Sequence, residues 1–147
     1  IVAVASGLLA ESKLTPELKN EAYYYRAKAL LAEGQSKEAV NDLSVLSKDT
    51  RNVYGAEAKY LLAQLYFDAG QTDKAEKEVL DYIEVSTPHA YWLARSFVLL
   101  SDVYMKLGRN LDAKQYLLSL QQNYQADDDI AGMIETRLAK LNKGSKQ

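Results

Sequence analysis

The sequence predicts an all-α fold: a right-handed α-α superhelix of about three stacked helical hairpins, with a partial hairpin before them and a capping helix after them. A short motif that begins with glycine occurs three times, at residues 34–39, 70–75 and 108–113, and we call it the turn motif. Each copy lies between stretches with helical apolar spacing. Gly34, Gly70 and Gly108 are almost evenly spaced, and an interval of this length is typical of solenoids. The 147 residues, 48% hydrophobic and 26% charged, fit one globular domain.

Each turn motif is expected to end one helix and begin the next. The glycine can adopt the left-handed conformation that ends a helix, because it has no Cβ. Two residues later stands a side chain that can accept a hydrogen bond from the first turn of the next helix. These predicted caps are Ser36, Thr72 and Asn110.

The chain is then divided in order. Residues 1–14 contain a short apolar helix, predicted to be half of a hairpin, so we expect the chain to be a segment of a longer repeat protein. Residues 15–52 form the first repeat, with Thr15 as a helix cap and Pro16 at the first helical position. Its first helix is predicted to run to about Glu33. The apolar stripe expected to be buried on this helix consists of Leu18, Ala22, Tyr25, Ala29 and Leu30.

The second and third repeats follow the same scheme at residues 53–88 and 89–126. Pro88 is predicted to end the second repeat, because proline cannot continue a helix. Residues 127–141 are predicted to form the capping helix, with an acidic run, 127–129, at the positive end of its dipole. Residues 142–147 are expected to be a frayed tail.

Composition and motifs argue against catalysis, cofactors and metals. The net charge of −2 gives no electrostatic case for nucleic acid, and no apolar run is long enough for membrane insertion. The absence of cysteine excludes disulfides and thiolate chemistry. The lone His89 has no second histidine or paired carboxylate near it in sequence, so a surface position at a helix start is favoured over a catalytic base. Residues 127–129 lack the alternating oxygen ligands of a calcium loop.

Large and small residues recur in a fixed order in each hairpin. The positions are Tyr23, Arg26, Ala27, Leu30, Ala39 and Leu43, then Lys59, Leu62, Ala63, Tyr66, Ala75 and Val79, then Phe97, Leu100, Ser101, Tyr104, Ala113 and Leu117. Over about residues 20–122 this pattern resembles the tetratricopeptide repeat. The resemblance implies close helix pairing at the small positions. Arg26 and Lys59 depart from it, standing where the family has leucine and an aromatic residue.

The interval between the glycines is longer than the usual period of this family, and it is similar to that of bacterial envelope repeat proteins, such as outer-membrane assembly lipoproteins and the Tol-Pal coordinator. This narrower resemblance implies a periplasmic location, with the cytoplasm as the alternative. Two functions follow from these resemblances. The first is a non-catalytic scaffold that holds a peptide or partner protein, and the second is a structural spacer or self-assembly module of an envelope complex.

The concave face, lined by the first helix of each repeat, is the predicted binding surface. The residues placed there are Tyr24, Lys28, Leu31, Tyr60, Gln64, Phe67, Arg95, Val98, Asp102 and Met105. Aromatic and arginine side chains often anchor interfaces, although each tyrosine could instead pack against a neighbouring helix. Tyr24 and Gln64 stand where some family members use lysine and asparagine to hold a peptide carboxylate, so that binding mode is not expected.

Overall fold

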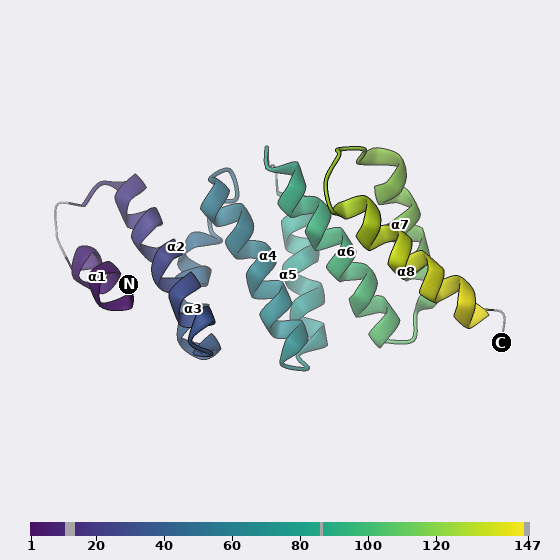
Figure 1. The fold of residues 1–147 in the computed structure, drawn as a ribbon, viewed down its shortest axis with the longest axis horizontal. Coiled ribbons are helices and arrows are strands. Elements are labelled where there is room, and N and C mark those ends of the chain that lie inside the picture. The colour runs from purple at the N-terminus through teal and green to yellow at the C-terminus, as the bar shows by residue number, and fades with distance from the viewer. Residues whose placement is uncertain (11–13, 86, 146–147) are drawn as a thin grey trace.

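The computed structural model of the chain describes residues 1–10, 14–85 and 87–145, which form eight α-helices and no strand. The helices follow one another along a single row (Figure 1). Their bounds are α1 (Val2–Leu9), α2 (Pro16–Ala32), α3 (Ser36–Leu46), α4 (Val53–Asp68), α5 (Thr72–Glu84), α6 (Ala90–Lys106), α7 (Asn110–Asn123) and α8 (Ile130–Ser145). No helix in these ranges has the length and apolar character needed to cross a membrane.

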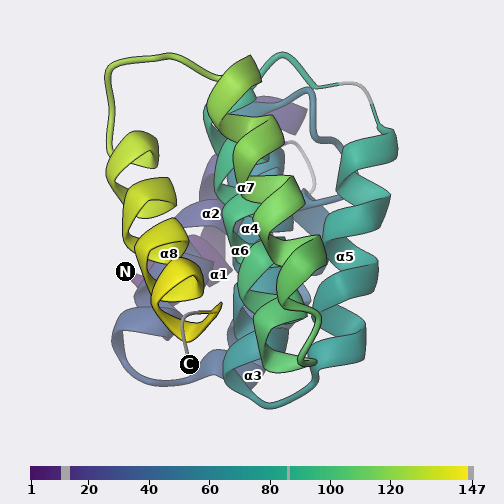
Figure 2. The ribbon, with the colours of Figure 1, turned by 90° about the vertical axis from the view of Figure 1, so that its right-hand side faces the viewer.

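The helices form three antiparallel hairpins, α2 with α3, α4 with α5 and α6 with α7, stacked side by side. We call α2, α4, α6 and α8 the first helices, and α1, α3, α5 and α7 the second helices. Viewed along the row, α8, a first helix, and α5, a second helix, lie on opposite sides of the molecule (Figure 2), and we refer to the two sets of helices as two layers. Consecutive first helices are in contact, whereas within the described ranges consecutive second helices are not. The first helices therefore lie on the inner side of the solenoid's curve, and we call this side the inner face.

The three glycine turns have the predicted left-handed geometry. Gly34, Gly70 and Gly108 have φ angles of 77°, 78° and 76°. In the first turn the Gln35 N–H donates to the Leu30 carbonyl at 2.8 Å, and the Gly34 N–H donates to the Leu31 carbonyl at 3.1 Å. This pair of hydrogen bonds is the Schellman motif, which satisfies the free carbonyl groups at a helix end.

The predicted side-chain caps after these turns are wrong. Ser36, Thr72 and Asn110 are the first residues of their helices, and the residue before each one, at the cap position, makes no side-chain cap hydrogen bond. The reason is the tightness of the turn. Gln35 closes the preceding helix through its N–H and accepts the first hydrogen bond of α3, from Ala39, through its carbonyl at 3.2 Å.

Side-chain caps are present where the links are longer. The predicted cap of α2 is confirmed, because Thr15 Oγ1 accepts from the Leu18 N–H at 3.3 Å. Asn52 caps α4 in the same way by accepting from the Tyr54 N–H at 2.8 Å, and this cap was not predicted from the sequence. Longer links allow these residues the extended backbone conformation that a capping residue needs.

The expected small positions lie where the paired helices meet. Ala27 and Ala39, Ala63 and Ala75, and Ser101 and Ala113 are each at most 1% exposed. Apolar residues from both layers then form two clusters, one around α2, α3 and α4 and one that extends from α4 to α8. The packing scheme predicted from the repeats is confirmed.

The two departures from the repeat pattern are both explained by ion pairs within a hairpin. Arg26 of α2 forms a two-pronged ion pair with Asp42 of α3, whose side chain is almost fully buried. Lys59 of α4 pairs with Glu78 of α5 at 2.7 Å. Both cations therefore replace an apolar contact between the first and second helix by a charged one.

Two expectations at the ends of the solenoid are wrong. Leu18 and Tyr25 of the predicted buried stripe are 49% and 52% exposed, because α1 covers only part of the side of α2 on which they lie. The last helix begins at Ile130, where the Asp128 carboxylate accepts from the Ile130 N–H at 2.9 Å, and it continues to Ser145. Residues 142–145 are thus helical rather than frayed, and residues 146–147 lie outside the described part of the chain.

Candidate functional site

Polar contacts join consecutive first helices across the inner face. Between α2 and α4, the Tyr24 hydroxyl donates to one carboxylate oxygen of Glu57 at 3.0 Å, and Lys28 Nζ donates to the other at 3.0 Å. The Glu57 side chain is only 10% exposed. Burial, followed by the adjacent Glu57 carboxylate, raises the pKa of Tyr24 to about 12. Two residues placed in the binding surface therefore hold the first two hairpins together.

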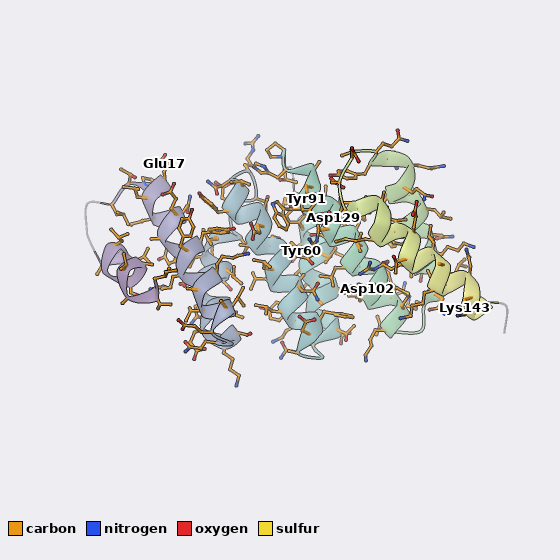
Figure 3. The ribbon with its side chains drawn as sticks, viewed as in Figure 1. Glu17, Tyr60, Tyr91, Asp102, Asp129 and Lys143 are labelled. Carbon is orange, nitrogen blue, oxygen red and sulfur yellow. The ribbon has the colours of Figure 1, made fainter. Side chains whose placement is uncertain are left out.

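Arg95 is the centre of the contact between α4 and α6. Its guanidinium donates to the Tyr60 hydroxyl at 3.0 Å and to the Tyr91 hydroxyl at 3.1 Å, and it lies 4.9 Å from the centre of the Tyr60 ring and 6.0 Å from that of Trp92. Tyr91 donates to Asp129 at 2.9 Å, which ties the start of α8 to the same cluster. Figure 3 shows Tyr60, Tyr91 and Asp129 grouped on this part of the inner face.

The third contact joins α6 to α8. Arg137 binds the Asp102 carboxylate with two hydrogen bonds of 2.7 and 3.0 Å, and it also donates to the Met133 carbonyl at 3.1 Å. Paired hydrogen bonds of this kind fix the relative orientation of the two side chains. Asp102, which the sequence placed on the binding surface, is thus also a structural link between two helices.

The predicted surface residues differ in how much surface they leave for a partner. Val98 and Tyr60 are 3% and 7% exposed, so they belong to the core. Gln64 accepts from the Tyr60 hydroxyl at 3.0 Å and donates to Asp68 at 2.8 Å. Leu31 packs partly buried against the first core cluster. These four side chains therefore have packing or hydrogen-bond contacts within the solenoid.

Phe67, Asp102 and Met105 are different, because they line a hollow of about 670 Å³ between α4, α6 and α8. We call it the inner hollow. Its ten lining residues are Phe67, Asp102, Met105, Lys106, Asn110, Thr136, Arg137, Lys140, Leu141 and Gly144. Phe67 and Met105 are partly buried against the core, so the hollow combines an apolar base with charged walls.

Sequence reasoning missed the α8 side of the hollow. Residues 127–141 were predicted only as a capping helix, so none of their side chains was placed on the binding surface. The repeat spacing could have revealed this. Adding the interval between Gly70 and Gly108 to the positions of Leu99 and Asp102 in α6 gives Arg137 and Lys140 in α8. Treating the last helix as a further first helix would have placed it beside α6.

The polar residues considered for chemistry have structural contacts. His89 is at the cap position of α6 as predicted, and its Nε2 lies 2.8 Å from the Arg51 carbonyl oxygen, which links two loops. In the acidic run, Asp128 caps α8 and Asp129 binds Tyr91. Across residues 1–10, 14–85 and 87–145, no three histidine, aspartate or glutamate side chains converge to hold a metal ion.

Comparison with known proteins supports the repeat assignment. The tetratricopeptide repeat family model matches residues 56–87 and 94–124, which correspond to the second and third hairpins. No curated protein and no solved structure matches the chain significantly. The resemblance seen in the sequence is therefore confirmed at the level of the repeat, whereas the likeness to envelope proteins stays a prediction.

Proposed function

We propose that this chain, which contains tetratricopeptide repeats, is a non-catalytic scaffold that holds an acidic segment of a partner protein in the inner hollow. Repeats of this type generally bind other proteins on the surface that their stacked helices create. The observation that carries the proposal is the composition of the inner hollow, in which an apolar base is bordered by more positive than negative side chains.

The charges of the hollow favour a negative partner. Three of the lining residues, Lys106, Arg137 and Lys140, are cationic, and Asp102 is the one acidic residue that lines it. Because Arg137 and Asp102 neutralise each other, the two lysines supply the excess. Both are exposed, so their side chains can reach a carboxylate without prior desolvation.

The apolar base supplies the anchor. Phe67 and Met105 are partly buried, and both contribute apolar side chains to the lining of the hollow, one aromatic and one flexible. An aromatic or aliphatic side chain of a partner would bury apolar area there, which is the usual source of binding energy at an interface hot spot. The proposed ligand is therefore an extended or helical segment with acidic residues around one apolar anchor.

The scaffold is rigid before the partner arrives. The contacts of Glu57, Arg95 and Asp102 fix each first helix to its neighbour, so the hollow is already formed in the free chain. Binding to such a surface requires little ordering of the scaffold, and this lowers the entropic cost of association.

The test uses a fluorescein-labelled, glutamate-rich peptide that contains a single phenylalanine, compared with the same peptide carrying glutamines. We expect fluorescence anisotropy to show binding of the acidic peptide that weakens with salt, and weaker binding of the glutamine peptide. Met105→Glu and Lys106→Glu are expected to reduce binding, each with an unchanged helical circular dichroism spectrum.

Lys77→Glu on α5 is the matched control, because it changes the net charge equally at an exposed site that does not line the hollow. Equal weakening by Lys77→Glu and Lys106→Glu would show that the peptide responds only to overall charge. Equal affinity for the two peptides would also refute the proposal.

A further inference from the structure

Met105 supplies the one sulfur atom among the ten residues that line the inner hollow. The chain contains two methionines, Met105 and Met133, and no cysteine. Met105 of α6 is partly buried against the core cluster that extends from α4 to α8, and it contributes to the apolar base of the hollow. Met133 of α8 packs against the same cluster but does not line the hollow. The two methionines therefore differ in whether a partner in the hollow would cover them.

The repeat register indicates what the position of Met105 requires. The intervals between the three glycines also separate Leu31 of α2, Phe67 of α4 and Met105 of α6. All three side chains are partly buried against the core clusters, so the shared requirement is apolar surface. A hydroperoxide oxidises a thioether, whereas leucine and phenylalanine have no sulfur that could react in this way. Met105 is therefore the member of this series whose apolar character can be removed by oxidation.

The surroundings of the sulfur favour that reaction. The thioether sulfur attacks one oxygen of the hydroperoxide, so that an S–O bond forms and the O–O bond breaks. The sulfur is oxidised by two electrons, the attacked oxygen gives up its proton, and the departing oxygen is reduced and takes up a proton to leave as water or an alcohol. Three cationic side chains line the same hollow, namely Lys106, Arg137 and Lys140. Positive charge near the departing oxygen stabilises the negative charge that develops on it.

We propose that Met105 is a modification site, and that its oxidation to the sulfoxide by a hydroperoxide weakens partner binding in the inner hollow. This inference rests on the proposed function, because it concerns regulation of the same hollow. Oxidation converts a flexible apolar side chain into a polar one. The sulfoxide oxygen is a hydrogen-bond acceptor, so an apolar side chain of the partner would remove water from it without replacing the lost hydrogen bonds.

A second effect acts in the same direction. Lys106 and Lys140 carry the positive charge that remains after Arg137 pairs with Asp102. An ammonium group can donate to a sulfoxide oxygen as well as to a carboxylate. A lysine that binds the oxidised Met105 is less available to an acidic residue of the partner. Oxidation is therefore expected to reduce both the apolar and the charged part of binding.

The modification is reversible. Methionine sulfoxide reductases, one for each sulfoxide epimer, return the side chain to the thioether, while a dithiol is oxidised to a disulfide and the oxygen leaves as water. The chain itself contains no cysteine, so no thiol of its own reacts with the hydroperoxide. Binding in the hollow then follows the balance between hydroperoxide and reductase.

The experiment uses two variants of the intact chain that retain one methionine each. Met133→Leu retains Met105, and Met105→Leu retains Met133; leucine is close to methionine in volume. Each variant is treated with hydrogen peroxide until mass spectrometry shows one added oxygen, and binding of the fluorescein-labelled, glutamate-rich peptide is measured before and after. Treated Met133→Leu is expected to bind about tenfold more weakly than before treatment, with an unchanged circular dichroism spectrum. Met105→Leu serves only as its own reference, and treatment is expected to leave its affinity where it was.

Two further measurements connect the effect to the hollow. Incubation of treated Met133→Leu with both reductases and dithiothreitol is expected to restore binding. In the natural chain, a saturating concentration of the peptide is expected to slow the oxidation of Met105 several-fold and to leave that of Met133 unchanged, because only Met105 of the two lines the hollow. Peptide mapping by mass spectrometry measures the two rates.

Other outcomes overturn the inference. If treated Met133→Leu binds as well as before, oxidation of Met105 does not regulate the hollow. If peroxide weakens binding by Met105→Leu to the same extent, the effect comes from Met133. Both results leave the proposed function standing. If the bound peptide does not slow the oxidation of Met105, it does not cover the sulfur. An untreated chain that binds no acidic peptide refutes the proposed function and the inference together.

Discussion

Replacing Gly55 by alanine tests whether the link between hairpins depends on direct backbone contact. Gly55 lies in the first turn of α4, and a Cβ added there would stand 1.8 Å from the Asp49 carbonyl oxygen and 2.6 Å from that of Leu46. The neighbours are backbone atoms already engaged in hydrogen bonds, since the Asp49 carbonyl accepts from the Asn52 N–H and the Leu46 carbonyl accepts from the Asp49 N–H. They cannot move aside without distorting the link.

The expected loss follows from two opposing effects. Overpacking at a rigid site costs up to about 3 kcal/mol, and alanine regains roughly 1 kcal/mol because it favours the helix over glycine. The net loss is about 2 kcal/mol in the free energy of unfolding, which corresponds to a fall of roughly 4 to 8 °C in Tm for a chain of this size. Urea unfolding followed by circular dichroism measures the first quantity, and a thermal scan measures the second.

Gly132→Ala is the matched control, because a Cβ at Gly132 in α8 would meet no atom within 4 Å. The same substitution is there expected to raise stability by about 0.5 to 1 kcal/mol. The two substitutions are expected to change the free energy of unfolding in opposite directions because the surroundings of the two glycines differ, although the chemical change is the same. If Gly55→Ala were as stable as the natural chain, or behaved like Gly132→Ala, the close approach of α4 to the preceding link would be refuted.

Three further predictions concern packing and charge. Arg26→Leu leaves the buried Asp42 carboxylate without its cation, so it is expected to lower the free energy of unfolding, measured with urea, by about 3 kcal/mol. Adding Asp42→Ala removes the unpaired carboxylate and is expected to recover most of this loss. A double variant no more stable than Arg26→Leu would contradict this. Ala75→Leu forces a larger side chain into a fully buried helix contact and is expected to lower the unfolding free energy by about 1 to 3 kcal/mol, so an unchanged urea midpoint would show that the paired helices can separate. The pKa values of Tyr24 and Tyr124 are raised to about 12, in both cases first by burial and then by a neighbouring carboxylate. The neutral tyrosines therefore contribute their full stabilisation below the pKa of about 10 that tyrosine has in the unfolded chain, and this contribution is lost as the pH rises from about 10 to about 12. Urea unfolding at a series of alkaline pH values measures the loss. A free energy of unfolding that stays constant across that range would contradict the prediction.

The turns and the helix pairing could be predicted from the sequence because they depend on local and periodic signals. The spacing between Gly34 and Ala39, which recurs at Gly70 and Ala75, marks both the left-handed turn and the first small contact of the next helix. The caps were predicted less well. Ser36 is of a type that often caps helices, but the turn is so short that Gln35 already occupies the cap position.

The inner face was harder to predict because a first helix touches its own partner and both neighbouring first helices. Periodicity places Val98 on the inner side of α6, but it does not say that a neighbouring helix covers it. The charges of Glu57 and Arg137 gave no warning of the contacts that link the first helices, because their partners lie 33 and 35 residues away in the sequence. The inner hollow depends on α8 lying beside α6, whereas the repeat pattern was matched only over about residues 20–122.

The glycine turns also determine where this architecture can change its length. In each turn one residue both closes the preceding helix and begins the next; these residues are Gln35, Gln71 and Arg109. Adding or removing a residue in these turns would therefore disrupt the end of one helix or the start of the next. The interval from Gly34 to Gly70 is shorter than that from Gly70 to Gly108, and the difference must then arise elsewhere. Within these two intervals the second helices differ by two residues, with 11 in α3 and 13 in α5, whereas the first helices differ by one, with 16 in α4 and 17 in α6. Insertions and deletions in natural variants are therefore expected on the outer layer and in the links that follow it, while the inner layer keeps its spacing and the shape it offers to a partner.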